Sequence, residues 1–170
     1  MTTKRFKFGI ILLLTISSCK NNQQNLMGKF TGMWKLDKYE SFDSASGKWH
    51  DAPSRVGYSG YILYDGKGHM GVQLLPPAFK DVDNTKNIDT LDDKELKKDL
   101  KLYSASFEYF ANCNIKKEPN SIEHHIVTSN NPEDWGTTVK RNFEFKGDTL
   151  ILTANELIGG HKTRLRWIKL

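Results

Sequence analysis

Apolar and polar residues alternate along most of the chain after residue 30. In residues 34–40 (WKLDKYE), large apolar side chains take every second position, and this period of two is typical of a strand with one buried face. Similar short segments follow, separated by turn residues such as Gly66, Gly68 and Gly147. The pattern predicts about eight strands, at residues 34–40, 57–65, 69–75, 112–118, 121–129, 137–146, 149–154 and 162–170.

One segment has helical spacing instead. Between Leu91 and Ala111, apolar side chains recur every three or four residues, at Leu96, Leu100, Tyr103, Phe107 and Phe110. Charged residues fill the early positions between them, and Thr90 or a following aspartate can act as N-cap. The spacing predicts one amphipathic helix over residues 91–111, with its aromatic stripe used for packing rather than for a cofactor.

The predicted elements define a fold class. Eight antiparallel strands can close into a barrel, which leaves no exposed sheet edge and an interior wide enough for one small ligand. We therefore expect an all-β domain over residues 30–170, an eight-stranded antiparallel barrel with the helix inserted between its third and fourth strands.

The first nineteen residues differ from the rest. Lys4, Arg5 and Lys7 precede a short apolar run at residues 8–16, which is the layout of an export signal and far below the ~20 residues of a membrane-spanning helix. Residues 16–19 (ISSC) resemble a lipobox, an aliphatic and two small residues before the cysteine that becomes lipid-modified. The resemblance implies a bacterial lipoprotein, and the alternative is an ordinary secretory signal with an accidental cysteine.

The lipoprotein interpretation fixes the expected processing and location. Residues 1–18 are then the signal peptide, Cys19 is the lipidated residue that holds the protein to a membrane, and residues 19–29 are a tether. Lys20 follows Cys19 in place of the aspartate that retains some lipoproteins at the inner membrane. We expect a lipid-anchored protein of the cell envelope, with the outer membrane preferred.

Charge and cysteine content limit the possible partners. The chain has 25 basic and 20 acidic residues, and three of the bases precede Cys19, which leaves 22 against 20 in the mature chain. This balance does not favour nucleic-acid binding. With Cys19 acylated, Cys113 has no partner for a disulfide and is interpreted as a half-buried apolar residue.

Two adjacent histidines suggest a site at first sight. In residues 121–129 (SIEHHIVTS), a strand would place His124 on the face of its isoleucine neighbours and His125 on the opposite face. The pair therefore cannot bind one metal ion together. We expect His124 to point into the barrel, either hydrogen-bonded within the core or contacting a ligand, and His125 to point outward.

Arg141 is the more informative polar residue. It shares a strand face with Val139, Phe143 and Phe145, so the face that should be buried carries a guanidinium group. A buried guanidinium requires a partner, and its planar fork suits a carboxylate. The partner is either an internal acid or the carboxylate of an acidic ligand such as a fatty acid, unless a strand bulge turns Arg141 outward.

A series of motifs runs in order along nearly all of the chain from residue 30. Gly32 and Trp34 fit the Gly-x-Trp signature of lipocalins, and Arg164 and Arg166 lie on the last predicted strand. Together with residues 60–64, 68–74, 109–110, 124–125 and 135–143, this series resembles the lipocalin-like domain family of bacteria and fungi. The resemblance implies that a late arginine packs across Trp34 and closes the base of the barrel.

The first functional hypothesis is a barrel that binds a small apolar or amphipathic molecule. Its expected ligand contacts are Arg141, His124, Tyr61, Tyr64, Met70, Val72, Gln73, Tyr103, Phe107 and Trp135. Tyr103 and Phe107 are placed on the helix, where they would cover one mouth. No glycine loop for phosphate, paired nucleophile and base, or calcium loop is visible, so the sequence predicts neither cofactor nor metal.

Two other functions stay open. One is an enzyme on the same scaffold, an isomerase, cyclase or hydrolase, with His124 as acid–base group and Arg141 as electrostatic stabiliser. A second inward titratable group within reach of His124 would support it. The other is an envelope protein-interaction module without a ligand, which a large exposed apolar patch and a filled barrel would support. Ligand binding is preferred to both.

Overall fold

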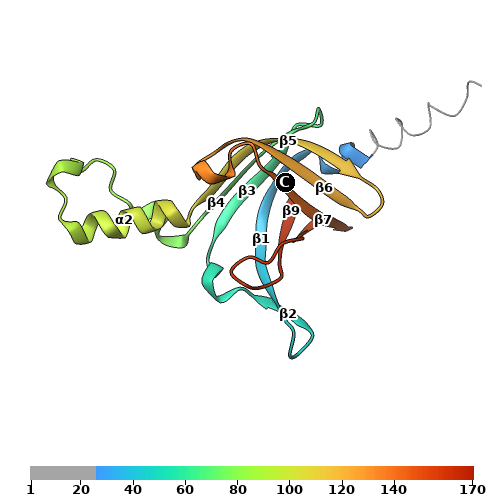
Figure 1. Ribbon diagram of the computed structural model, residues 1–170, viewed down its shortest axis with the longest axis horizontal. Coiled ribbons are helices and arrows are strands. Elements are labelled where there is room, and N and C mark those ends of the chain that lie inside the picture. The colour runs from blue at the N-terminus through green and yellow to red at the C-terminus, as the bar shows by residue number, and fades with distance from the viewer. Residues whose placement is uncertain (1–25) are drawn as a thin grey trace, which may run out of the picture.

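The computed structural model describes residues 26–170, so the predicted signal peptide and Cys19 lie outside the described residues. Eight strands form a closed antiparallel barrel, because the first strand pairs both with the next strand of the barrel and with the last strand (Figure 1). The barrel strands are β1 (Gly32–Asp43), β3 (Ser59–Tyr64), β4 (His69–Leu75), β5 (Phe107–Lys116), β6 (Ser121–Ser129), β7 (Thr138–Lys146), β8 (Thr149–Ala154) and β9 (Thr163–Lys169). The predicted all-β barrel is confirmed.

A ninth strand was not predicted from the sequence. β2 (Lys48–Asp51) pairs with the last four residues of β1 and extends that strand beyond the barrel as a hairpin. Its four residues (KWHD) are too few to show an alternating pattern, and β2 is an edge strand that pairs with β1 alone. The prediction missed it for that reason.

The predicted helix of residues 91–111 is too long. Helix α2 (Asp93–Ala105) begins after Asp92, whose side chain accepts a hydrogen bond from the backbone N–H of Glu95, and it ends before Ser106. Phe107 and Phe110 belong to β5 instead. Both residues fit a helical spacing of three and four, but β5 also alternates, and pairing with β4 and β6 decides the outcome.

The two ends of the barrel differ. At one end, residues 26–30 are helical, and the ring of Phe30 is fully buried with edge contacts to Tyr64, Phe143 and Phe145 at 5.0–5.1 Å. The indole N–H of Trp34 donates to the Phe30 carbonyl at 2.7 Å. This segment closes one end of the barrel. The opposite end carries the β4–β5, β6–β7 and β8–β9 connections, where the cavity described below opens.

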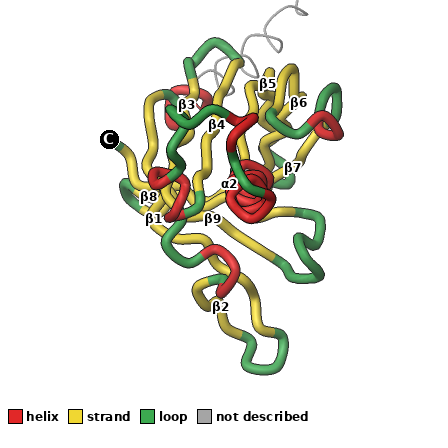
Figure 2. The backbone as a smooth tube through the Cα atoms, turned by 90° about the vertical axis from the view of Figure 1, so that its left-hand side faces the viewer, coloured by secondary structure: helices red, strands yellow, loops and turns green. Residues whose placement is uncertain are grey.

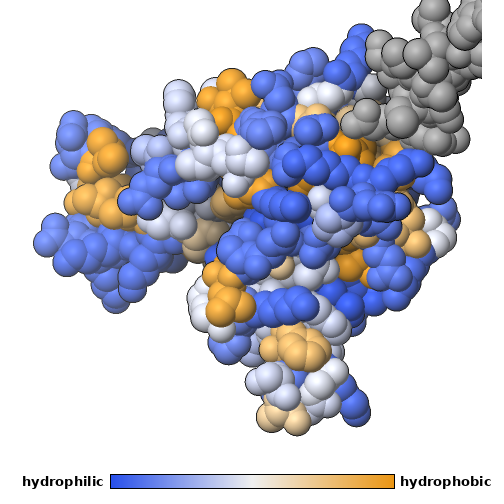
Figure 3. Space-filling model, turned by 45° about the vertical axis from the view of Figure 1, so that its right-hand side comes forward, coloured by the Kyte–Doolittle hydropathy of each residue, from blue (hydrophilic) through white to orange (hydrophobic). Residues whose placement is uncertain are grey.

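Helix α2 leaves the barrel at this open end. Figure 1 shows it projecting away from the strands, Figure 2 shows it end-on, and no α2 residue is buried. The prediction that the helix covers the mouth of the barrel is therefore wrong, since only the C-terminal end of the helix reaches the cavity. The visible face of the molecule is mostly hydrophilic, with apolar side chains in several separate places, on the projecting part as well as on the barrel (Figure 3). No helix in residues 26–170 has the length and apolar character needed to cross a bilayer.

Candidate functional site

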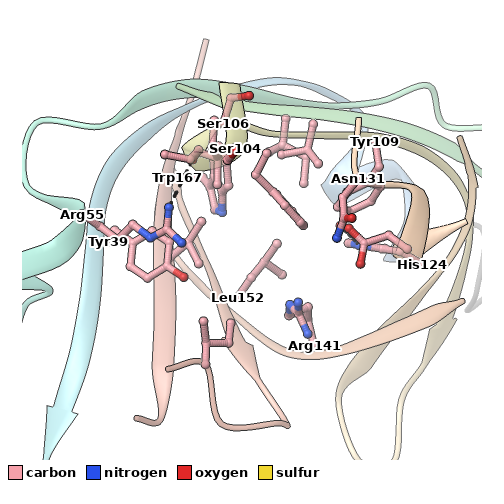
Figure 4. Close-up of a pocket in the computed structure, with 18 residues that line it drawn as sticks. Tyr39, Arg55, Ser104, Ser106, Tyr109, His124, Asn131, Arg141, Leu152 and Trp167 are labelled. Atoms are coloured by element: carbon pink, nitrogen blue, oxygen red, sulfur yellow. Dashed lines mark hydrogen bonds between the residues drawn. The ribbon is translucent and has the colours of Figure 1, made fainter. Parts of the chain in front are cut away.

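A cavity of ≈ 280 Å³ lies inside the open half of the barrel (Figure 4). Its inner wall is mainly apolar and comes from strands on all sides of the barrel, through Ile62, Val72, Leu74, Phe107, Leu152, Leu165 and Trp167. Polar side chains interrupt this wall at Tyr109, His124 and Arg141. The rim is formed by Tyr39, Arg55, Ser104, Ala105, Ser106, Asn131, Asp134 and Ile158. The cavity is thus an apolar space with a few convergent polar groups.

His124 lies between two tyrosines within the barrel. Its Nε2 is 3.1 Å from the Tyr64 hydroxyl and its Nδ1 is 2.7 Å from the Tyr109 hydroxyl, and the side chain is 1 % exposed. Burial, helped by the positive charge of Arg141, lowers the pKa of His124 to about 3. The ring is therefore neutral at pH 7, and of the two expected roles the structure shows the internal hydrogen bonds.

His125 points the other way, as predicted. Its ring is exposed, and Nδ1 lies 2.7 Å from the hydroxyl of Thr138 on the outer surface of the barrel. The strand separates the adjacent histidines, so they cannot share a ligand or an ion. Among residues 26–170, no group of three or more His, Cys, Asp or Glu side chains is arranged to hold a metal ion.

The low pKa of His124 predicts a specific loss of stability in mild acid. Between about 3 and the ordinary value of 6.5, the unfolded chain binds a proton at this residue and the folded chain does not. The contribution of the neutral His124 ring to the free energy of unfolding is therefore complete above pH 6.5. It falls as the pH drops, by ~1.4 kcal/mol per pH unit. Urea unfolding of the wild type and of His124→Gln at pH 7, 6 and 5 should show a smaller pH slope for the variant. His125→Gln should keep the wild-type slope, and equal slopes in all three proteins would contradict the assignment.

Arg141 points inward from β7, as its apolar strand face predicts, and its side chain is 11 % exposed. Its Nη1 donates to Glu156 Oε1 at 2.6 Å and to the Lys140 carbonyl at 2.9 Å. Of the two partners expected from the sequence, the structure supplies the acid. Glu156 lies in the β8–β9 connection with its side chain 47 % exposed, and within residues 26–170 the Arg141 hydrogen bonds all use Nη1. Nε and Nη2 thus remain available as donors.

Arg55 is a rim residue that the sequence did not indicate. Its guanidinium stacks on Tyr58 at 4.9 Å and donates to the Tyr58 hydroxyl and the Ala105 carbonyl. No acid in the described part of the chain lies within ion-pair distance of it. Figure 4 shows Arg55 across the cavity from Tyr109 and His124. Arg55 ends a short 3-10 helix (Pro53–Arg55) in a connection without periodicity, so no sequence pattern could place it at the cavity.

The other predicted contacts divide into three groups. Val72 and Phe107 line the cavity, the latter from β5 rather than from the helix. Tyr64 and Met70 are buried inside the barrel but outside the cavity lining. The remaining predicted contacts do not line the cavity and have exposed side chains, namely Tyr61, Gln73, Tyr103 and Trp135.

These four misplacements have simple physical causes. The β3–β4 hairpin buries Ile62 and Val72, which turns Tyr61 and Gln73 to the outer face. Tyr103 packs against Phe79 at the projecting helix, with ring centroids 5.2 Å apart. The indole N–H of Trp135 donates to the Ser129 carbonyl within its own loop, and the side chain is 56 % exposed.

The base of the barrel is closed differently from the expectation. Gly32 starts β1 with a φ of 120°, and Trp34 is buried, as the signature implies. However, Lys169 lies over the Trp34 ring at 5.1 Å, and neither predicted arginine does. Arg164 pairs with Glu40 and stacks on Trp49, and Arg166 lies 3.5 Å from Asp37. The strand register explains why Lys169 takes the place expected for an arginine. Trp34 is opposite Lys169, while both arginines pair with β1 residues nearer the mouth.

The interior polar groups are not poised for proton transfer at neutral pH. Tyr64 and Tyr109 are titratable groups within reach of His124, a feature that was expected to support the enzyme hypothesis. Burial raises the pKa of both hydroxyls well above the ordinary value and lowers the pKa of His124. Efficient general acid–base catalysis needs a pKa near the working pH. The arrangement instead keeps three uncharged, hydrogen-bonding groups beside an apolar cavity.

Comparison with known proteins agrees with this architecture. A family model described as a lipocalin-like domain matches residues 31–169, which include every strand of the barrel. No curated protein sequence and no solved structure gave a match to the chain.

Proposed function

Because the chain belongs to the lipocalin-like domain family, whose barrel fold suggests ligand binding in general, we propose that it holds one small apolar or amphipathic molecule inside the barrel. The observation that carries this proposal is the cavity of ≈ 280 Å³ with an apolar wall and three inward polar side chains. Ligand sites in proteins typically combine these features. A cavity of this kind also favours ligand binding over the alternative of a protein-interaction module, because that alternative predicts a filled barrel.

The size of the cavity limits the ligand. Pockets for drug-sized molecules span roughly 300–1,000 Å³, so ≈ 280 Å³ corresponds to a compact molecule or a short chain. Two guanidinium groups, Arg55 at the rim and Arg141 in the wall, favour a molecule with an anionic end. A short fatty acid combines both properties and serves as a suitable probe.

The proposal includes attachment to the bacterial cell envelope through a lipid on Cys19. Its support is the lipobox-like run at residues 16–19 behind an export-type signal. The described domain begins at residue 26, in the short helical segment that ends with Phe30 at the closed end of the barrel. A tether would therefore join the described domain on the side opposite to the mouth. Outer-membrane location, preferred because Lys20 follows the cysteine, is part of the same proposal.

Replacing Arg141 with alanine should weaken the binding of octanoate roughly tenfold or more. The change removes a nearly buried guanidinium from the cavity wall, and a charged hydrogen bond contributes about 1.5–3 kcal/mol. Titration of the ¹⁵N-labelled domain, followed by NMR shifts of the lining residues, would give both affinities. The loss of Arg141 leaves Glu156 unpaired but half exposed to water, so the fold should persist.

Lys140→Ala is the matched control for this experiment. It removes a positive charge from the adjacent position of the same strand, but Lys140 does not line the cavity. Octanoate should bind this variant with nearly unchanged affinity. Equal affinities for Arg141→Ala and Lys140→Ala would refute a role of Arg141 in holding a carboxylate. Absence of octanoate-induced shifts at the lining residues of all three proteins would count against the ligand-binding proposal itself.

A further inference from the structure

The hydrogen bonds around His124 determine which way its neighbours donate. A neutral imidazole has one N–H donor and one bare nitrogen acceptor. Each ring nitrogen of His124 faces one tyrosine hydroxyl, so one tyrosine donates its proton to the ring and the other accepts a proton from it. The accepting tyrosine must then direct its own O–H elsewhere. Only two arrangements are possible, and they differ in which hydroxyl is left to find another partner.

In the first arrangement, Tyr64 donates to the bare Nε2, and Nδ1–H donates to Tyr109. The Tyr109 hydroxyl then directs its proton toward the cavity, which Tyr109 lines. In the second arrangement the protons are reversed, and the Tyr64 O–H needs an acceptor. Tyr64 is 1 % exposed, lies outside the cavity lining, and within residues 26–170 His124 is its hydrogen-bond partner.

The first arrangement is therefore favoured. A buried hydroxyl without an acceptor is costly, whereas a hydroxyl beside an open space can donate to water or a ligand. The surroundings of Tyr64 make the second arrangement worse, because the other ring that contacts Tyr64 besides His124 is the apolar ring of Phe30. Under the first arrangement, His124 carries its proton on Nδ1 and Tyr109 is a donor toward the cavity.

Other polar groups of the inner wall are donors too. The indole N–H of Trp167, a lining residue that is 1 % exposed, has no hydrogen-bond partner within residues 26–170. Arg141 has only donors, and its Nε and Nη2 are not engaged by the described residues. The acidic lining residue, Asp134, lies at the rim in the β6–β7 connection. The inner wall thus offers an apolar surface interrupted by donors.

We propose that the cavity selects a compact apolar molecule that carries an acceptor oxygen, a carbonyl or a carboxylate, which receives the Tyr109 hydroxyl. His124 is a positioning residue in this proposal, because it holds Tyr109 as a donor without contacting the ligand through its own nitrogens, both of which are already bonded. The inference rests on the proposed ligand-binding function and specifies the chemistry of the ligand.

The tautomer of His124 tests the proton arrangement without any ligand. The two neutral tautomers of histidine differ clearly in their ¹⁵N chemical shifts and in which ring nitrogen couples to the carbon-bound protons. The full domain, labelled with ¹⁵N at histidine, should show His124 protonated at Nδ1 at pH 7. Protonation at Nε2 would overturn the inference, because Tyr109 would then donate to the ring.

Acetophenone and α-methylstyrene test the selectivity. They have nearly the same shape, but the first carries a carbonyl oxygen where the second carries a methylene group. The wild type should bind acetophenone about fivefold to tenfold more tightly, as expected for one additional hydrogen bond. In Tyr109→Phe, this preference should fall below about twofold while α-methylstyrene still binds.

Tyr64→Phe is the matched control, since it deletes the same hydroxyl on the other side of His124, away from the cavity lining. It should lower the stability but still bind acetophenone more tightly than α-methylstyrene, because Tyr109 keeps a hydroxyl that can donate to the ligand. Equal binding of the two probes by the wild type, or a full preference in Tyr109→Phe, would overturn the inference about the donor. Failure of the wild type to bind either probe or octanoate would instead contradict the ligand-binding function on which the inference rests.

Discussion

Phe30→Ala should lower the free energy of unfolding by about 3–5 kcal/mol, a large effect for a residue that precedes the first barrel strand. The ring is fully buried and makes edge contacts with Tyr64, Phe143 and Phe145 at 5.0–5.1 Å. Truncation leaves a cavity at the closed end and exposes core side chains to water. Urea denaturation, followed by tryptophan fluorescence, would measure the change in midpoint.

Phe110→Ala is the appropriate comparison, because it deletes the same side chain from an exposed position. Phe110 points outward from β5 and is 68 % exposed, so its replacement should cost less than about 1 kcal/mol. If the two variants lost similar stability, residues 26–30 would not close the barrel in the manner described. The difference between them therefore measures the contribution of the segment that precedes β1.

Leu152→Trp should reduce the affinity for octanoate by a factor of roughly 100 or more. Leu152 is buried on β8 and lines the cavity, where Figure 4 places it between Arg55 and Arg141. An indole at this position occupies the space that the ligand needs, and ≈ 280 Å³ leaves little room for both. A hundredfold loss corresponds to about 2.7 kcal/mol of binding free energy. The same NMR titration as for Arg141→Ala gives the affinity.

Ile168→Trp on β9 is the control for the added side chain. Ile168 points to the outer surface and is 38 % exposed, so an indole there adds bulk outside the barrel. Octanoate binding should stay within about twofold of the wild type, as usual for surface changes away from a site. Unchanged affinity in Leu152→Trp would place the ligand outside the described cavity. Thermal unfolding of both variants would show whether the larger core side chain also strains the barrel.

The sequence predicted the barrel well because alternation is a strong local signal. β6 and β8 have the predicted bounds, and the closing pairs between β1 and β9 follow from the need to remove open edges. Phe107 was assigned to the wrong element because its spacing from Tyr103 fits a helix. Its pairing with Leu74 of β4 is a long-range contact that a local pattern cannot show.

The candidate site was predictable where one strand carried a clear pattern. Arg141 and His124 both point inward because each shares a face with apolar neighbours on its own strand. Tyr61 was misplaced because the hairpin is rich in large apolar and aromatic residues on both faces, so alternation did not distinguish them. Arg55 lies in an irregular connection, and only the closure of the barrel brings it to the cavity.

Native mass spectrometry of protein freshly purified from its own cells tests the central claim most directly. The wild type should retain a small non-covalent adduct that is released by mild activation and carries a carbonyl or carboxylate oxygen. Leu152→Trp, purified in parallel, should be detected at the mass of the protein without an adduct. A wild type that is empty under the gentlest conditions, or a Leu152→Trp variant that keeps the same adduct, would contradict ligand binding in the barrel cavity.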